Sequence, residues 1–332
     1  MSYTLDIVWG RGKVWSLRLP VTQEVAGSNP VVPARGQIAQ SVEHLSEKQG
    51  VGSSILPLAT KKIMKKIILI IKRLIVETKK GLNSDSEYND NYIDFLEKAV
   101  QDNKIFENFR DHPAYKAIVE TVREPLGIKC YEKLIKSFSH NQIYDYCSPL
   151  NSPGNPEMIK INGDYFSTTA LRYLTIAVDI KTLYGNNKIR KIVELGPGFG
   201  GQAIMLNQFF NIDQYTFVDL TTANLLTKKF LSYKDVSFEK KFCSIESGVE
   251  DEYDLFISNF AYSELPKKYQ KLAYKKFIQN SKYGYMIVNN YWHITFRYFT
   301  KLHYKYYLKN LIIEDEIPVS NSFNKVLIFK EL

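Results

Sequence analysis

The sequence has few cysteines and no long apolar run, and both shortages exclude classes of protein. Its 332 residues contain three cysteines without a C-x-x-C pair, which argues against a disulfide framework or a zinc site and fits a reducing compartment. The nearest approach to an apolar span, Ile67 to Val76, is interrupted by Lys72 and Arg73, far short of the roughly 20 residues that cross a bilayer. The first residues also lack the pattern of a signal peptide. We therefore expect a cytoplasmic protein without a transmembrane segment.

Tyrosine is almost missing from the first sixty residues. Only one of the 23 tyrosines, Tyr3, lies there, in a stretch rich in Ser, Gly, Val and Pro with no sustained helical or strand period. The segments Val21 to Arg35 and Gly36 to Lys62 resemble the peptide obtained when a tRNA gene and its flank are translated. We expect residues 1–62 to be an unstructured extension or no part of the natural protein, with Met64 as an ordinary start. A flexible targeting or partner-binding arm is the alternative.

The net charge of +9 admits an acidic partner such as a nucleotide, a phospholipid or an anionic glycan. The lysines are spread rather than clustered, which is typical of a solvated surface, and we expect no nucleic-acid partner. Residues 64–80 form a basic amphipathic pattern that ends at Gly81. We expect this helix to pack on its own domain, with weak contact with an acidic membrane surface as the alternative. The oligomeric state is left open.

The chain then divides into a helical and an alternating part. Residues 63–150 carry apolar residues at helical spacing, and we expect them to cap a site and shape a substrate pocket. A Pro/Gly/Asn-rich connection covers 148–167. In residues 151–332 helices alternate with short apolar strands, which predicts a doubly wound, mostly parallel α/β sheet covered on both faces. The strands are expected at 191–195, 215–220, 236–243, 253–259, 283–290 and 324–331.

A glycine-rich turn follows the first of these strands, in the stretch "VELGPGFGG". With Gly201 as the third glycine it matches G-x-G-x-x-G, the dinucleotide fingerprint. It also matches E-x-G-x-G-x-G, the first motif of S-adenosylmethionine (SAM) methyltransferases. Both patterns place a tight turn without side chains between a strand and a helix, so that a cofactor can approach the backbone. The residues of the second pattern are Glu194, Gly196, Gly198 and Gly200.

Charge favours the second pattern. Glu194 lies two residues before the first glycine, where a carboxylate would repel a pyrophosphate and attract the ammonium and sulfonium groups of SAM. Asp219, at the tip of the second strand, can accept hydrogen bonds from ribose hydroxyls, a feature that NAD shares with SAM. Glu246 follows the third strand, where contact with the adenine edge is expected. Asn259 ends the fourth strand and is counted with the cofactor contacts, although it is also placed to meet an acceptor.

The motifs "VELGPGFGGQ", "YTFVDL", "DLFISNFAYSELP" and "GYMIVNN" resemble those of the class I SAM-dependent methyltransferases. With "SPGNPEMIKINGDYFSTTALRYL" ahead of the glycine turn, they are most similar to the sugar O-methyltransferases of bacterial surface-polysaccharide clusters. The resemblance covers roughly residues 100–332. It implies a Rossmann-like seven-stranded sheet whose last strand inserts antiparallel, with "NKVLIFKE" in that place. It also implies a SAM site made of Glu194, the three glycines and Asp219.

Methylation of a sugar hydroxyl would be helped by a base, because such a hydroxyl is a poor nucleophile at neutral pH. Glu264, which follows the fourth strand, is the first candidate, with a helix-capping or surface role as the alternative. His293, after the fifth strand, is the second candidate, although a lone histidine is more often structural. We see no metal cluster. The expected substrate contacts, on a free or carrier-linked sugar, are Arg172, Tyr262, Ser263, Asn289 and Asn290; for Arg172, pairing with the SAM carboxylate or a surface salt bridge are the alternatives.

Two other functions compete with this one. An NAD(P)-dependent Rossmann-type sugar dehydrogenase or epimerase would use the same glycine turn, but such enzymes place it near the chain start and often carry a Tyr-x-x-x-Lys pair. Here Tyr269 is followed four residues on by Ala273. A non-catalytic methyltransferase-like binding subunit is the third hypothesis. The intact Glu194 and Asp219 argue against a decayed cofactor site.

Overall fold

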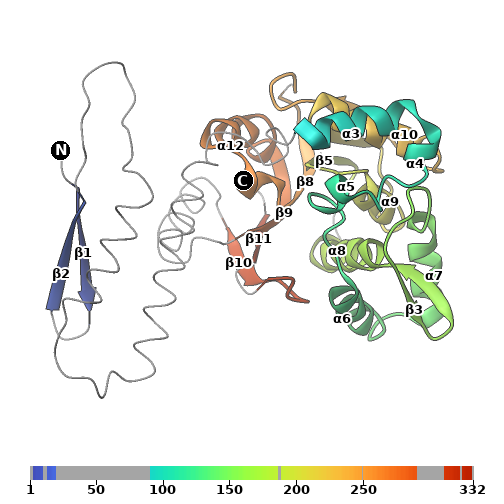
Figure 1. Cartoon of the computed structure of the whole chain (residues 1–332), viewed down its shortest axis with the longest axis horizontal. Coiled ribbons are helices and arrows are strands. Elements are labelled where there is room, and N and C mark those ends of the chain that lie inside the picture. Colours follow the sequence, from blue (N-terminus) through green and yellow to red (C-terminus); the bar gives the residue numbers. More distant parts are fainter. Residues whose placement is uncertain are drawn as a thin grey trace. The chain divides into compact units, whose positions relative to one another are not determined.

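The computed structural model describes residues 3–9, 13–19, 90–185, 188–248, 250–289, 310–321 and 324–330 (Figure 1). The chain divides into two compact units, Met1–Leu74 and Ile75–Leu332. What is described of the first unit is one antiparallel hairpin, β1 (Tyr3–Trp9) paired with β2 (Lys13–Leu19). This hairpin differs from the sequence analysis, which found no sustained strand period there. The dispensability of residues 1–62 stays a prediction, and the expected helix at 64–80 lies outside the described residues.

The second unit is built around a seven-stranded sheet with the order β10-β11-β9-β8-β5-β6-β7. Neighbouring strands run parallel except around β11, which is antiparallel to both β9 and β10. This is the mostly parallel Rossmann-like sheet, with its antiparallel last strand, that the sequence predicts, so the predicted fold class is confirmed. Strand β10 was not expected. The strands are β5 (Lys191–Leu195), β6 (Gln214–Val218), β7 (Glu239–Cys243), β8 (Tyr253–Asn259), β9 (Ser281–Val288), β10 (Ile312–Asp315) and β11 (Lys325–Lys330).

Both faces of the central strands of the sheet are buried. Successive side chains leave a strand on opposite faces, and alternate residues of β8 accordingly belong to different hydrophobic clusters: Leu255 and Ile257 to one, Phe256 to the other. The first cluster includes side chains of α8 (Thr168–Tyr184), α9 (Gly201–Asn207) and α10 (Thr221–Leu231). The second includes side chains of α11 (Ala261–Glu264), α12 (Lys267–Ala273) and the π-helical turn Tyr274–Ile278. Helices therefore cover the two faces, as in a doubly wound fold.

The helical region before the sheet packs on it rather than standing apart. Phe109 of this region lies edge-on to Phe230 of α10, with ring centroids 6.2 Å apart, and both belong to the first cluster. Helix α3 lies alongside α10 in Figure 1. The division at residue 150 stays a prediction, since both sides belong to one compact unit. The helices are α3 (Asp90–Gln101), α4 (Asn103–Phe106), α5 (Pro113–Lys116), α6 (Glu124–Leu134) and α7 (His140–Cys147), followed by a 3-10 turn, Ser148–Leu150.

A short hairpin interrupts the segment that was expected to be a plain connection. Strands β3 (Met158–Ile161) and β4 (Asp164–Ser167) pair antiparallel. Asn162 and Gly163 form the two-residue turn, with φ of +50° and +103°. Positive φ at both positions is what a type I′ hairpin turn requires, and Asn-Gly is its preferred sequence. Among the described residues, no helix is long and apolar enough to cross a membrane.

Candidate functional site

The glycine turn between β5 and α9 has a backbone that only glycine adopts easily. Gly196, Gly198 and Gly200 have φ of +73°, +58° and +85°. There is also no room for side chains, because a Cβ on Gly196 would overlap the Cβ of Ala261, and one on Gly198 would lie 2.8 Å from a methyl carbon of Val119. The turn is thus fixed against both the β8 end and the helical region.

Glu194, the last residue but one of β5, is a buried acid at the base of this turn. Its side chain is 1% exposed and accepts a hydrogen bond of 2.7 Å from the hydroxyl of Tyr215. Burial raises the pKa of the carboxyl to about 7, against the lowering effect of that hydrogen bond, and the nearby charge of Asp219 adds to the rise. A cation bound beside Glu194 would offset this burial penalty.

Asp219 is the first residue after β6 and lies at the same edge of the sheet. One carboxyl oxygen accepts a 2.8 Å hydrogen bond from the backbone N–H of Leu220. Burial raises the pKa of Asp219 to about 7, although the backbone N–H groups of Leu220 and Gly198 lower it. The site therefore holds two neighbouring carboxyls that change charge near neutral pH, and their titrations are coupled.

Two tyrosine hydroxyls face the turn, and a third tyrosine stacks on one of the two rings. A Cβ on Gly198 would lie 3.9 Å from the hydroxyl of Tyr173, in α8, and 4.0 Å from that of Tyr115, in α5. Tyr92 of α3 stacks on Tyr115, with ring centroids 6.1 Å apart. Burial raises the pKa of all three; the charge of Asp219 adds to the rise for Tyr92, and those of Glu120 and Glu194 for Tyr173. The three hydroxyls therefore keep their protons at neutral pH.

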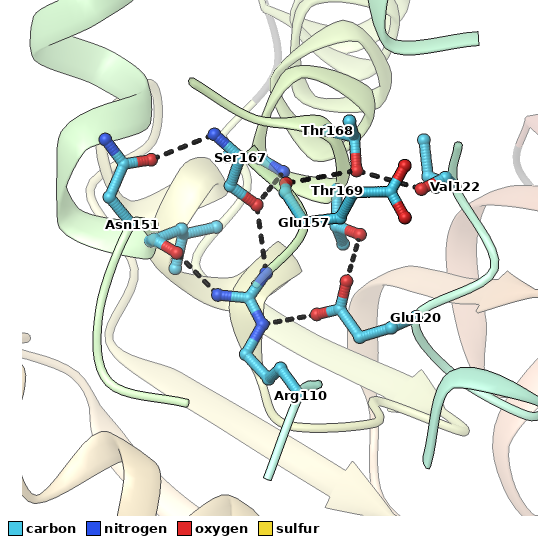
Figure 2. Close-up of polar contacts among 10 residues, drawn as sticks. Arg110, Glu120, Val122, Asn151, Glu157, Ser167, Thr168 and Thr169 are labelled. Carbon is cyan, nitrogen blue, oxygen red and sulfur yellow. Dashed lines mark hydrogen bonds and ion pairs between the residues drawn. The ribbon is translucent and has the colours of Figure 1, made fainter. Parts of the chain in front are cut away.

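A buried arginine fixes the segment that carries Tyr115 (Figure 2). Arg110 is fully buried and forms an ion pair with Glu120 through its Nε atom. Its two terminal nitrogens donate to the carbonyl oxygen of Leu150, at 2.5 Å, and to the hydroxyl of Ser167, at 3.1 Å. The second carboxylate oxygen of Glu120 accepts a hydrogen bond from Thr169. This network neutralises the buried charge and ties residues 110–120 to the start of α8.

The same network reaches the glycine turn through Phe199, the residue between Gly198 and Gly200. The guanidinium carbon of Arg110 lies 4.3 Å from the centroid of the Phe199 ring, within cation–π distance. Phe230 and Tyr173 also pack on this ring, at centroid distances of 4.8 and 5.8 Å. The turn is therefore supported by the helical region and not by the sheet alone.

Three residues predicted to meet an acceptor come together at the ends of β8 and β9. The backbone N–H of Asn289 donates to the hydroxyl of Ser263 at 3.0 Å, and its side-chain amide donates to the carboxylate of Glu264 at 2.5 Å. Ser263 in turn donates to the carbonyl oxygen of Phe260 at 2.7 Å. Glu264 is exposed to solvent. A carboxylate, an amide and a hydroxyl thus form one polar group beside the strand ends.

Asn259, the last residue of β8, has an unusual side-chain environment. Both polar atoms of its side-chain amide are buried, and among the described residues neither has a hydrogen-bond partner. Phe260, which follows, has a φ of +74°, an uncommon and strained value for a bulky residue. Unpaired buried amides are costly, so a ligand that pairs with Asn259 would recover this free energy.

Arg172 and Tyr262 are placed differently from the other predicted contacts. Arg172 is buried and forms an ion pair with Glu316, which follows β10, while its guanidinium carbon lies 5.4 Å from the centroid of the Phe260 ring. Tyr262 is 3% exposed and belongs to the second hydrophobic cluster. Their substrate contacts stay predictions, and the surroundings of Tyr262 give that assignment no support.

The remaining predicted residues lie farther along the same edge or outside the described chain. Glu246 is exposed after β7, and its carbonyl oxygen accepts a 2.5 Å hydrogen bond from Lys276. Desolvation opposes its charge, but hydrogen bonds with its own backbone, Tyr269 and Ser244 outweigh it and lower its pKa. Asn290 and His293 lie outside the described residues. In the described ranges no group of His, Cys, Asp and Glu could hold a metal ion.

The sequence analysis did not identify the residues that the helical region contributes. Arg110, Glu120 and Tyr115 lie some 75 to 85 positions before the glycine turn, and long-range packing alone brings them to it. Tyr173 sits one position beyond the predicted Arg172 and faces the turn. No local pattern marks them: in "NFRDHP" Arg110 stands between Phe109 and Asp111, a context that is equally ordinary for an exposed arginine.

Comparisons with known proteins find only remote structural similarities. No protein-family model and no curated protein matches the chain. Among solved structures, the methyltransferase domain of bacterial CtHen1 is 14% identical over 48% of this chain and 97% of that one, with a TM-score of 0.38. An rRNA methylase from Streptococcus thermophilus is 13% identical, over 47% and 96%, with a TM-score of 0.36. A Pyrococcus abyssi tRNA (uracil-54, C5)-methyltransferase in complex with S-adenosylhomocysteine is 13% identical, over 53% and 44%, with a TM-score of 0.35. At these identities and TM-scores we infer neither activity nor substrate from them.

Proposed function

We propose that this protein is a SAM-dependent methyltransferase. The observation that carries the proposal is Glu194, a buried carboxyl at the base of a glycine turn that has no room for side chains. Two acids, Glu194 and Asp219, lie at this site, and their negative charges would repel a pyrophosphate. A cationic amino acid group is attracted there, and its charge would compensate for the burial of both carboxyls.

The described residues fit SAM. Glu194 and the backbone of the turn would hold its amino acid part, and Asp219 would accept hydrogen bonds from the ribose hydroxyls. The unpaired amide of Asn259 supplies a donor and an acceptor at the end of the neighbouring strand, and Glu246 remains the residue proposed for the adenine edge. When bound, SAM supplies a methyl carbon that is activated by its sulfonium group.

We propose a sugar hydroxyl as the acceptor, in surface-polysaccharide or nucleotide-sugar metabolism. The polar group of Ser263, Glu264 and Asn289 supports this choice, because hydroxyl, carboxylate and amide side chains are suited to sugar hydroxyls. Glu264 would accept the proton of the attacking hydroxyl, and Asn289 would hold the carboxylate in place. Asn290 and His293 follow β9 in the chain and remain candidates for further contacts.

Calorimetry of the full chain against S-adenosylhomocysteine (SAH), SAM and NAD tests the cofactor. We expect SAH and SAM to bind and NAD to show no heat of binding. Glu194→Gln should weaken SAH binding, whereas Glu239→Gln, at an exposed position on β7, should not. Tight binding of NAD without binding of SAH would favour the dehydrogenase or epimerase hypothesis instead.

The acceptor class needs a separate assay. Transfer of a labelled methyl group from SAM would be measured with a panel of nucleotide sugars and, in parallel, with unmodified tRNA and rRNA. We expect label in the sugar panel only. Label in RNA alone would overturn the sugar assignment and leave the methyltransferase proposal standing. SAH binding without transfer to any acceptor would favour the non-catalytic hypothesis.

A further inference from the structure

The hydroxyl of Tyr115 is the starting point. It is fully buried, and in the part of the chain that the structure describes it has no hydrogen-bond partner. A buried hydroxyl without a partner costs free energy, and isosteric phenylalanine would avoid the cost. The hydroxyl faces Gly198 of the cofactor turn, so a ligand in that turn is the natural partner.

The hydroxyl of Tyr173 lies on the same side of the turn. The two tyrosine oxygens are 4.0 and 3.9 Å from the position that a Cβ of Gly198 would take. Tyr115 belongs to the helical region and Tyr173 to α8. Both hydroxyls keep their protons, so they can donate hydrogen bonds. Glu194 and Asp219, the acids of the site, come from the strand ends. Hydroxyl donors and carboxyls therefore meet at the same turn.

A zwitterion matches this combination of hydroxyl donors and carboxyls. The amino acid part of SAM carries an ammonium group, which the two carboxyls attract, and a carboxylate, which they repel. That carboxylate needs donors, and the arginines near it are engaged: Arg172 with Glu316 and Arg110 with Glu120. Tyr115 and Tyr173 offer hydroxyl donors in the right place.

The buried arginine network supports such a role. Arg110 and Glu120 fix the segment that carries Tyr115 (Figure 2). Glu120 also accepts a hydrogen bond from Thr169, which lies in the first turn of α8, one turn before Tyr173. The charges of Glu120 and Arg110 act on the pKa of both tyrosines in opposite directions, Glu120 raising it and Arg110 lowering it, so the ion pair is close to both hydroxyls and positions them without a net charge.

We propose that Tyr115 and Tyr173 form the subsite for the carboxylate of the cofactor's amino acid part, held in position by Arg110 and Glu120. This inference rests on the proposed function, since it assumes a SAM-type ligand in the turn. It makes the helical region a part of the cofactor site and not only a cover for the acceptor.

The test compares two ligands and three variants. Tyr115→Phe and Tyr173→Phe are measured by calorimetry with SAH and with its decarboxylated analogue, which keeps the amine and lacks the carboxylate. Tyr165→Phe, a tyrosine that is 54% exposed on β4, is the matched control. We expect each site variant to bind SAH about 10-fold more weakly, as for loss of a hydrogen bond to a charged group, and to bind the analogue like the wild type. We also expect Tyr115→Phe without ligand to melt no lower than the wild type.

The outcomes separate the two levels of the proposal. Equal weakening for both ligands would show that the tyrosines shape the pocket without binding the carboxylate, and would overturn the subsite. Unchanged SAH binding in both variants would overturn it as well. If the wild type binds neither ligand, the proposed function itself fails, a result distinct from either.

Discussion

The two halves of the site differ in how they are built. On the cofactor half, between β5 and β6, Glu194 is buried, Asp219 is partly buried, and the glycines have positive φ. On the acceptor half, at the ends of β8 and β9, the acid is Glu264, exposed and bonded to Asn289. The first half is therefore sensitive to any added atom, because backbone and burial define it. The second depends on single functional groups that can be exchanged without disturbing the fold.

The largest effect should come from adding one carbon atom to the cofactor half. In Gly196→Ala the new Cβ meets that of Ala261, and the φ of +73° strains any residue with a side chain. Strain of about 1–2 kcal/mol and overpacking of about 1–3 kcal/mol disfavour the present conformation of the turn, and because that conformation is the one proposed to bind, we expect SAH affinity to fall by about 10²-fold or more. Calorimetry measures the affinity and circular dichroism the fold.

Gly163→Ala separates strain from overlap. Gly163 has a φ of +103°, but no atom lies within 4 Å of its added Cβ. We expect this variant to melt lower by a few degrees and to bind SAH like the wild type. Equal SAH affinity of Gly196→Ala and the wild type would mean that the turn does not touch the ligand.

The acceptor half should respond in turnover alone. Glu264→Gln keeps the shape and the hydrogen bond with Asn289 but cannot accept a proton, so turnover on an identified acceptor should fall by about 10²-fold while SAH affinity stays constant. Glu252→Gln, exposed before the amino end of β8, is the control. Full turnover in Glu264→Gln would remove Glu264 as the base, and His293 would be tested next.

The pH dependence of SAH affinity should distinguish the halves further. Burial raises the pKa of Glu194 and Asp219 to about 7, so both carboxyls are largely protonated at pH 6. They must release these protons before they can pair with the ammonium group of the ligand. Affinity should therefore rise from pH 6 to 8, by up to about 10-fold per unit for each proton released. Glu194→Gln should bind about 10-fold more weakly at pH 8 and show a flatter profile. A profile identical to that of the wild type would contradict a role for Glu194.

The sequence predicted the sheet and the glycine turn better than the rest, for identifiable reasons, while the roles of the site residues stay predictions. Strands buried on both faces, such as "KIVEL", give continuous apolar runs, and the turn after it needs glycines wherever φ is positive. The hairpin at Asn162 and Gly163 carried its usual turn signal, which a Pro/Gly/Asn-rich context concealed. Strand β10, four residues long and largely exposed, has no apolar alternation to detect.

The contribution of the helical region could not be predicted at all. Tyr115 and Arg110 reach the turn only because α3 and α5 pack onto α10 and the sheet, and such contacts leave no local pattern. The ion pair between Arg172 and Glu316 joins positions 144 apart in the same way. Local sequence thus indicated the strands and the glycine turn, whereas long-range packing brought the helical region to them.

The smallest expected effect is on the stability of the unliganded protein. Because the pKa of Glu194 and Asp219 is raised from ordinary values near 4 to about 7, the folded state binds more protons than the unfolded state between these values. The contribution of these two groups to the free energy of unfolding therefore decreases as the pH rises from 5 to 7 and is constant at higher pH. Melting curves from pH 5 to 8 should show wild type falling by a few degrees relative to Glu194→Gln, which has one such group fewer. Glu264→Gln, altered at an exposed acid, should follow the wild type throughout. A constant difference between wild type and Glu194→Gln would show that this carboxyl is already ionised at pH 5, and the contrast between a buried and an exposed half would not extend to their charges.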